Sequence, residues 1–226
     1  MNEKNLPGGE MSSRILDFFW IADCSGSMHG EKIQTLNYAI RQTIPDMRKE
    51  ADANPNASVV VRAVKFSDGA TWHGSVATSI DDFNWSELTA GGVTAMGMAL
   101  ELVAGELNQF QLDVKRLPPV LVLLSDGQPT DDFKKGLDAL LAVPWGKKAV
   151  RIAIAIGKDA DQTVLEQFTG NKELVLPANN PQQLVKSIKW ASTVIKNVSA
   201  PRAGDSTGGV DPSTIPAVSD DDDDIW

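Results

Sequence analysis

Three short segments of this chain are rich in the oxygen-bearing side chains that hard metal ions prefer. The first segment places Asp23, Ser25 and Ser27 at alternating positions in the run DCSGSM. The other two hold Thr94, which follows two glycines, and Asp126, in the run SDGQPTDD. Mg²⁺ takes about six oxygen ligands in octahedral geometry, so two carboxylates and three hydroxyls at one place would suit it. The sequence therefore predicts a metal site formed by these five residues.

Each of the three segments adjoins an element that could hold it at one edge of a sheet. Positions 15–22 and 120–124 are almost wholly apolar without periodicity, which is typical of strands buried on both faces. A helical pattern at 95–107 follows Thr94 directly. In open α/β sheets, ligands bind outside the carboxyl ends of the strands. We therefore expect the five ligands to converge at that edge.

The remaining elements alternate between strands and helices. Further strands are expected at 58–66, 70–74, 150–156 and 174–176, and further helices at 31–53, 131–143, 160–168 and 181–198. Pro45 is expected to kink the first helix or to mark a restart. The turn signal at Ser67, Asp68 and Gly69 favours an antiparallel edge strand after it. The predicted fold class is α/β: a doubly wound, mostly parallel, Rossmann-like sheet with one antiparallel edge strand and helices on both faces.

The composition divides the chain into a folded part and a polar end. We expect a flexible leader at 1–13, one folded domain at 14–199, a disordered linker at 200–219 and an acidic, aromatic tail at 220–226. After residue 200 there are seven Asp and one Arg, so the end of the chain carries most of the net charge of −9. The folded part is therefore only mildly acidic, and no basic face for nucleic acid is indicated.

The cysteine content and the hydropathy of the chain indicate in which cellular compartment the protein is expected. Cys24 is the only cysteine, so no intrachain disulfide can form, which suits a reducing compartment. Residues 1–13 lack the apolar core of a signal peptide, and no run approaches the roughly 20 apolar residues of a membrane helix. We expect a cytoplasmic protein without a membrane partner; the alternatives are export by another route or origin as a processed piece of a larger chain.

The run DCSGSM resembles the motif that opens the metal-ion-dependent adhesion site (MIDAS) of the von Willebrand factor A family. Thr94 and Asp126 match the second and third loops of that site, and the resemblance covers residues 14–199. It implies that Mg²⁺ is the cofactor, with Mn²⁺ or Ca²⁺ as alternatives. It also implies that the metal accepts a Glu or Asp from a partner protein and that Thr94 ligates directly in the engaged state.

Within the family, the runs CSGSM, TAMG and SDGQPTD resemble the bacterial cytosolic TerY-like branch. That branch is associated with tellurium resistance and with stress or phage-defence gene clusters. The resemblance implies a scaffold or regulator beside a protein kinase and a metal-dependent protein phosphatase. It implies no enzyme activity of the chain itself.

Two other functions compete with this interpretation. A haloacid-dehalogenase-type phosphotransferase also places an Asp at the end of its first strand, but it needs a second Asp two residues later, where this chain has Ser25. A hydroxyl cannot supply the general acid–base catalysis of that carboxylate. The second alternative is an oligomerisation module whose metal only fastens the loops.

Several nearby residues have simpler interpretations. Asp23 and Thr94 could be ordinary turn or helix-capping residues if each is taken alone. We expect Asp131 and Asp132 to cap the helix that follows them rather than to bind metal. The tryptophans Trp72 and Trp85 could form an aromatic rim beside the metal or simply pack, and the two histidines, His29 and His73, lack partners at zinc-binding spacing.

The end of the chain is a second candidate site. Its residues are Asp220, Asp221, Asp222, Asp223, Asp224, Ile225 and Trp226. The acidic run could steer binding and the last two residues could anchor it, or the segment could only keep the protein in solution. It resembles in kind the acidic tip of bacterial single-strand DNA-binding proteins. One further hypothesis is that an Asp of the tail binds the metal of the same or another copy.

Overall fold

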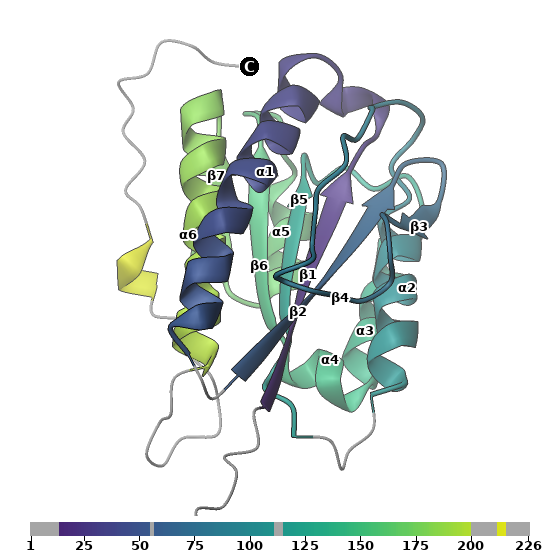
Figure 1. Cartoon of the computed structure of the whole chain (residues 1–226). Helices are drawn as coiled ribbons and strands as arrows, with labels where there is room; N and C mark the ends of the chain where they lie inside the picture. Colours follow the sequence, from purple (N-terminus) through teal and green to yellow (C-terminus); the bar gives the residue numbers. More distant parts are fainter. Residues whose placement is uncertain (1–13, 55–56, 111–114, 200–211, 216–226) are drawn as a thin grey trace, which may run out of the picture.

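The computed structural model describes residues 14–54, 57–110, 115–199 and 212–215, and these form a seven-stranded sheet flanked by helices (Figure 1). The strands are β1 (Arg14–Asp23), β2 (Ala57–Phe66), β3 (Ala70–Trp72), β4 (Thr78–Ser79), β5 (Val120–Ser125), β6 (Val150–Ile156) and β7 (Val175–Ala178). Their order is β3-β2-β1-β5-β6-β7, and β4 pairs with β2. The pairs that β2 makes with β3 and β4 are antiparallel, and the others are parallel. The predicted fold class is confirmed, with β4 as an antiparallel strand that was not expected.

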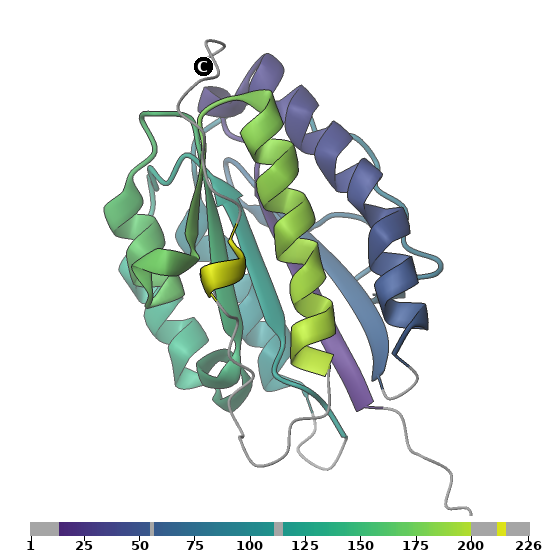
Figure 2. The same ribbon diagram turned by 90° about the vertical axis from the view of Figure 1, so that its left-hand side faces the viewer.

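The helices cover both faces of the sheet (Figures 1 and 2). They are α1 (Glu31–Asp52), α2 (Met96–Asn108), α3 (Phe133–Ala142), α4 (Pro144–Lys148), α5 (Gln162–Thr169) and α6 (Pro181–Ser199), with 3₁₀ turns η1 (Gly26–Met28), η2 (Lys172–Leu174) and η3 (Pro212–Thr214). Helices α1 and α6 pack on one face, and α2 to α5 on the other. Along β1, Phe18 and Trp20 enter the first core, and Phe19 and Ile21 enter the second. Burial on both faces explains why this strand has no polar alternation.

Two helices differ from the sequence prediction. Helix α1 passes through Pro45 without a restart, and the proline lies on its exposed side. The carbonyl that loses its hydrogen-bond partner there can be satisfied by water, which explains why the helix tolerates the ring. The helix expected at 131–143 begins two residues later, because Asp132 is the N-cap of α3, and it ends at Ala142. Helix α4 follows separately, with Pro144 in its first turn.

Helices α2 and α3 touch through two glycines. A Cβ added to Gly136 would overlap the carbonyl oxygen of Gly97 and would lie 2.7 Å from Gly97 Cα. A Cβ on Gly97 would overlap the backbone oxygen of Asp132 in the same way. Only glycine permits this approach, so the two backbones fix the position of α2, the helix that Thr94 precedes.

A buried ionic cluster occupies the sheet nearer the amino end of β1. The fully buried carboxylate of Asp17 forms ion pairs with both Arg62 and Arg116. Arg62 also donates from Nε to Glu106 at 3.0 Å, which ties the sheet to α2. The Arg116 guanidinium lies 4.0 Å from the centroid of the Phe110 ring. These contacts compensate one another's charges inside the fold.

Part of the expected linker is structured. Residues Pro212–Thr214 form η3, where Trp190 of α6 donates from Nε1 to Thr214 Oγ1 at 3.2 Å. Ile215 packs against the core beneath α1 and α6. The expected leader, most of the expected linker and the acidic tail lie outside the described residues. Among the residues that are described, no helix has the length and apolar character needed to cross a membrane.

Candidate metal centre

The first carboxylate of the site lies at the junction of two central strands. Ala22 of β1 is opposite Leu124 of β5, so the next residues, Asp23 and Ser125, are neighbours. Asp23 is 0% exposed, and its Oδ1 accepts a 2.8 Å hydrogen bond from the Ser25 amide. Its Oδ2 accepts a 2.5 Å bond from Ser125 Oγ. The carboxylate is therefore held in one orientation at the carboxyl edge of the sheet.

The two serines of the first loop lie beside each other. The Oγ atoms of Ser25 and Ser27 are 2.9 Å apart, with Ser25 buried and Ser27 exposed. The loop is joined to the glycines of the second loop by two backbone bonds: Gly26 N donates to Gly92 O at 3.0 Å, and Gly91 N donates to Cys24 O at 2.9 Å. These two bonds bring the first and second loops together.

Thr94 does not act as the cap of α2. Ala95 holds the N-cap position, and within the described residues the Thr94 hydroxyl forms no hydrogen bond. The backbone of Thr94 is held instead by Thr130, because Thr94 N donates to Thr130 Oγ1 at 3.0 Å and Thr130 N donates to Thr94 O at 2.9 Å. Thr94 therefore does not cap α2, and among the described residues no hydrogen bond occupies its hydroxyl.

Asp126 supplies an unpartnered acceptor. Its Oδ1 is buried and has no hydrogen-bond partner among the described residues. Burial raises the pKa of Asp23 to about 6, against hydrogen bonds from Ser125 and Ser25 that lower it, and the nearby Asp126 charge raises it further. Two buried carboxyl groups, one of them with an oxygen that lacks a hydrogen-bond partner, raise the free energy of the folded state unless a positive charge lies beside them. The donor set therefore fits a hard divalent cation.

The comparison with protein families agrees with this geometry. The model of the von Willebrand factor type A domain matches residues 17–191, which is most of the chain. The chain belongs to the von Willebrand factor type A (VWA) family. A search of the curated proteins found no match.

Solved structures show the same VWA fold. Proximal thread matrix protein 1 of the mussel byssus has a TM-score of 0.58 at 21% identity, covering 80% of this chain and 47% of its own. The ArnB paralog VWA2 of Sulfolobus acidocaldarius has a TM-score of 0.59 at 18% identity, covering 77% and 44%. The vWF domain of the pilus tip protein Mfa5 of Porphyromonas gingivalis has a TM-score of 0.61 at 9% identity, covering 84% and 98%.

These matches differ in extent. The chain spans less than half the length of the mussel and Sulfolobus proteins but almost the whole Mfa5 domain. Another structure of the mussel protein, with a TM-score of 0.56 at 19% identity, is described as having a zinc-occupied MIDAS motif. At these identities the likeness establishes the fold of the VWA domain.

Residues other than the five predicted ligands hold the loops of this VWA domain in place. Ser125 orients Asp23, and it also accepts from the Gly127 amide at 2.9 Å. Asp68 Oδ1 accepts from the Val93 amide at 3.0 Å, so it holds the second loop. No local sequence pattern predicts this role, because each of these residues forms its hydrogen bond with a loop that is distant in the sequence.

The two adjacent carboxylates of the third loop, Asp131 and Asp132, contact different helices. Asp132 caps α3, as expected, by accepting from the Lys135 amide at 2.9 Å. Asp131 does not cap that helix but accepts from the amides of Gly97 and Met98 of α2, at 2.9 and 2.8 Å. The Asp131 carboxylate thus pairs two first-turn amides of α2 that have no partner within the helix, and the third loop is coupled to the helix that follows Thr94.

The other candidates near the site have structural partners. Cys24 donates from Sγ to the Phe66 carbonyl at 3.2 Å, and burial raises the pKa of its thiol. Trp85 is buried and donates from Nε1 to Asn37 Oδ1 at 2.9 Å, so it belongs to the core and forms no rim. Two apolar side chains next to Thr94 are exposed instead: Val93 at 51% and Met98 at 48%.

Proposed function

We propose that this VWA domain is a metal-dependent protein–protein interaction module. The observation that carries the proposal is the buried, unpartnered Oδ1 of Asp126 beside the buried carboxyl group of Asp23. Asp23, Ser25, Ser27, Thr94 and Asp126 would hold the ion, which is Mg²⁺ in this proposal, with Mn²⁺ or Ca²⁺ as alternatives. When bound, the ion supplies an electrophilic centre for a carboxylate of a partner protein.

The residues of the chain prepare this centre in distinct ways. The Ser125 hydroxyl and the Ser25 amide fix both oxygens of Asp23, so the carboxylate does not reorganise when a cation arrives. The Thr130 contacts fix the backbone of Thr94 while its hydroxyl stays unused. The exposed side chains of Val93 and Met98 give the partner apolar surface next to its carboxylate.

We propose a non-enzymatic role, which the chemistry of the first loop supports against one class of enzyme. Ser25 stands where a phosphotransferase of the haloacid-dehalogenase type needs a carboxylate, and its Oγ lies beside that of Ser27. On the resemblance to the TerY-like branch, the role is that of a cytoplasmic scaffold or regulator in bacterial stress or phage-defence signalling. Its proposed partners are a protein kinase and a metal-dependent protein phosphatase.

Calorimetric titration of Mg²⁺ and Mn²⁺ tests the metal site directly. We expect the wild type to bind one ion per chain and Asp23→Ala to lose binding. Asp46→Ala is the matched control, because Asp46 is an exposed carboxylate on α1. Binding that persists in Asp23→Ala would overturn the assignment of the ligands.

A pulldown from bacterial lysate with and without EDTA tests the interaction. We expect bound protein to be released by EDTA and to be absent with Asp23→Ala. Metal binding without EDTA-sensitive partners would instead indicate an ion that only fastens the loops, as in an oligomerisation module.

A further inference from the structure

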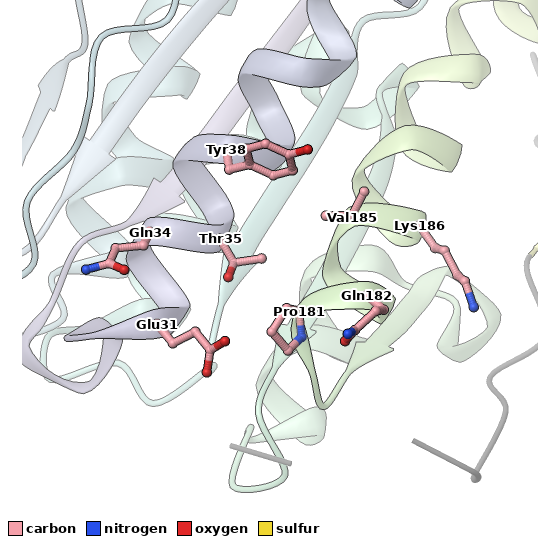
Figure 3. A pocket seen from close by; sticks show the side chains of 8 residues that line it. All are labelled: Glu31, Gln34, Thr35, Tyr38, Pro181, Gln182, Val185 and Lys186. Carbon is pink, nitrogen blue, oxygen red and sulfur yellow. The ribbon is translucent and has the colours of Figure 1, made fainter. Parts of the chain in front are cut away.

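An open groove of about 550 Å³ runs between α1 and α6, and none of the five proposed metal ligands lines it (Figure 3). In Figure 3, Tyr38 and Thr35 extend from α1 towards α6, and Pro181 and Val185 border the groove on the α6 side. Tyr38 is 53% exposed, which leaves much of an aromatic side chain uncovered. A volume of this size is within the range of about 300–1,000 Å³ that is typical of pockets for small ligands.

The charged residues of α6 are all basic. The helix contains Lys186, Lys189 and Lys196 and no acidic residue. Lys196 lies 4.0 Å from Glu50 of α1, but among the described residues Lys186 and Lys189 are exposed and form no ion pair. Lys186 borders the groove, and its side chain extends from the flank of α6 that faces away from α1 (Figure 3). This flank would attract an acidic segment.

The chain reaches this flank just before its acidic end. The η3 turn lies beside α6 on the side opposite α1 in both views (Figures 1 and 2), held by the Trp190–Thr214 hydrogen bond. Eleven residues follow Ile215, and they end in five Asp, Ile225 and Trp226. An extended chain of that length spans about 36–40 Å, which is far more than the roughly 10–12 Å diameter of a helix. The segment can therefore cross α6 and reach the groove.

We propose that residues 216–226 dock on their own domain. The acidic run lies along Lys186 and Lys189, and Ile225 and Trp226 enter the groove against Tyr38 and Val185. Charge complementarity guides the run, and burial of two large apolar side chains holds its end. A linker this short gives an effective concentration in the millimolar range, so a weak contact suffices. The docking does not involve the metal, so it stands or fails independently of the proposed function.

Methyl NMR spectra of the full chain test the proposal. An indole next to Val185 and Thr35 changes the resonances of their methyl groups, so Trp226→Ala should shift both. The methyl groups of Leu140, buried on the other side of the sheet, should not move. The shifts should be the same in EDTA as in Mg²⁺. Unchanged Val185 and Thr35 resonances in Trp226→Ala would overturn the proposal.

Charge reversal and dilution separate the alternatives. Lys186→Glu with Lys189→Glu should reproduce the spectrum of Trp226→Ala at Val185 and Thr35, and so should a high salt concentration. The matched control is Lys172→Glu, which replaces an exposed lysine of η2 and should leave the Val185 and Thr35 resonances unchanged. The difference between wild type and Trp226→Ala at Val185 and Thr35 could also disappear on dilution while a dimer dissociates. In that case the groove takes the end of a second copy, and docking within one chain is wrong.

Discussion

At the scale of single residues, the site depends on carboxyl groups that are unfavourable without metal. Burial raises the pKa of Asp23 from 3.8 to about 6, so ionisation of this group opposes folding of the metal-free protein. The loss of folding free energy caused by Asp23 ionisation is small below pH 4, grows as the pH rises towards 6, and is constant at higher pH. One pKa unit corresponds to about 1.4 kcal/mol, so the full effect is on the order of 3 kcal/mol.

The variant Asp23→Asn tests this linkage. In EDTA, its free energy of unfolding relative to wild type should increase between pH 4 and pH 7 by up to about 3 kcal/mol, because asparagine cannot ionise. In saturating Mg²⁺ at pH 7 the order should reverse, because only the wild type gains stability from the ion. Urea unfolding at four pH values measures both effects. A difference that does not vary with pH would contradict the assignment of the raised pKa to Asp23.

The five ligands could be proposed from the sequence because each belongs to a short motif. Their supporting residues could not. Ser125 reaches Asp23 only because β1 and β5 are adjacent and in this register, and Thr130 reaches Thr94 only because two loops meet. Asp131 illustrates the same limit, because its position before α3 predicted a cap for that helix, whereas its carboxylate serves α2.

At the scale of secondary-structure elements, the contact between α2 and α3 positions the second and third loops together. Asp131 joins the third loop to the first turn of α2, and the backbones of Gly97 and Gly136 meet a short distance away. The loop with Thr94 and the loop with Asp126 therefore belong to one packed unit.

Gly136→Ala should disrupt this unit. The new Cβ would overlap the Gly97 carbonyl, so α2 and α3 must separate, and we expect a loss of about 2–3 kcal/mol in the free energy of unfolding. Gly105→Ala is the matched control, because nothing lies within 4 Å of a Cβ there. In mid-helix it should stabilise by about 0.5–1 kcal/mol. Thermal unfolding of both variants is the measurement; equal effects would contradict the packing.

The long elements could be predicted because their burial leaves a clear pattern, but the short ones could not. The all-apolar run at 120–124 and the run at 150–156 correspond to β5 and β6 almost residue for residue. Strand β4 has two residues and α4 has five, so neither has a periodicity to recognise.

At the scale of the whole molecule, metal binding should appear as thermal stability. With free Mg²⁺ at about 100 times its dissociation constant, the native state gains about 2.7 kcal/mol. For a domain of this size that raises Tm by roughly 5–10 °C. Calorimetric scans in Mg²⁺ and in EDTA measure the difference, and Asp23→Ala should show no dependence on Mg²⁺. The same Tm in both buffers for the wild type would argue against a bound ion.

The course of β1 through the molecule also determines how the domain responds to force. Arg14 lies at one end of the sheet and Asp23 at the other, and β1 is paired with β2 along this whole length and with β5 over its later half. A pull on the metal loops against an attachment near residue 14 would act along the strand axis. It would load the hydrogen bonds on both sides of β1 together, in shear, instead of opening them one after another. With such an attachment, a partner held at the metal loops would be resisted by both sets of hydrogen bonds at once.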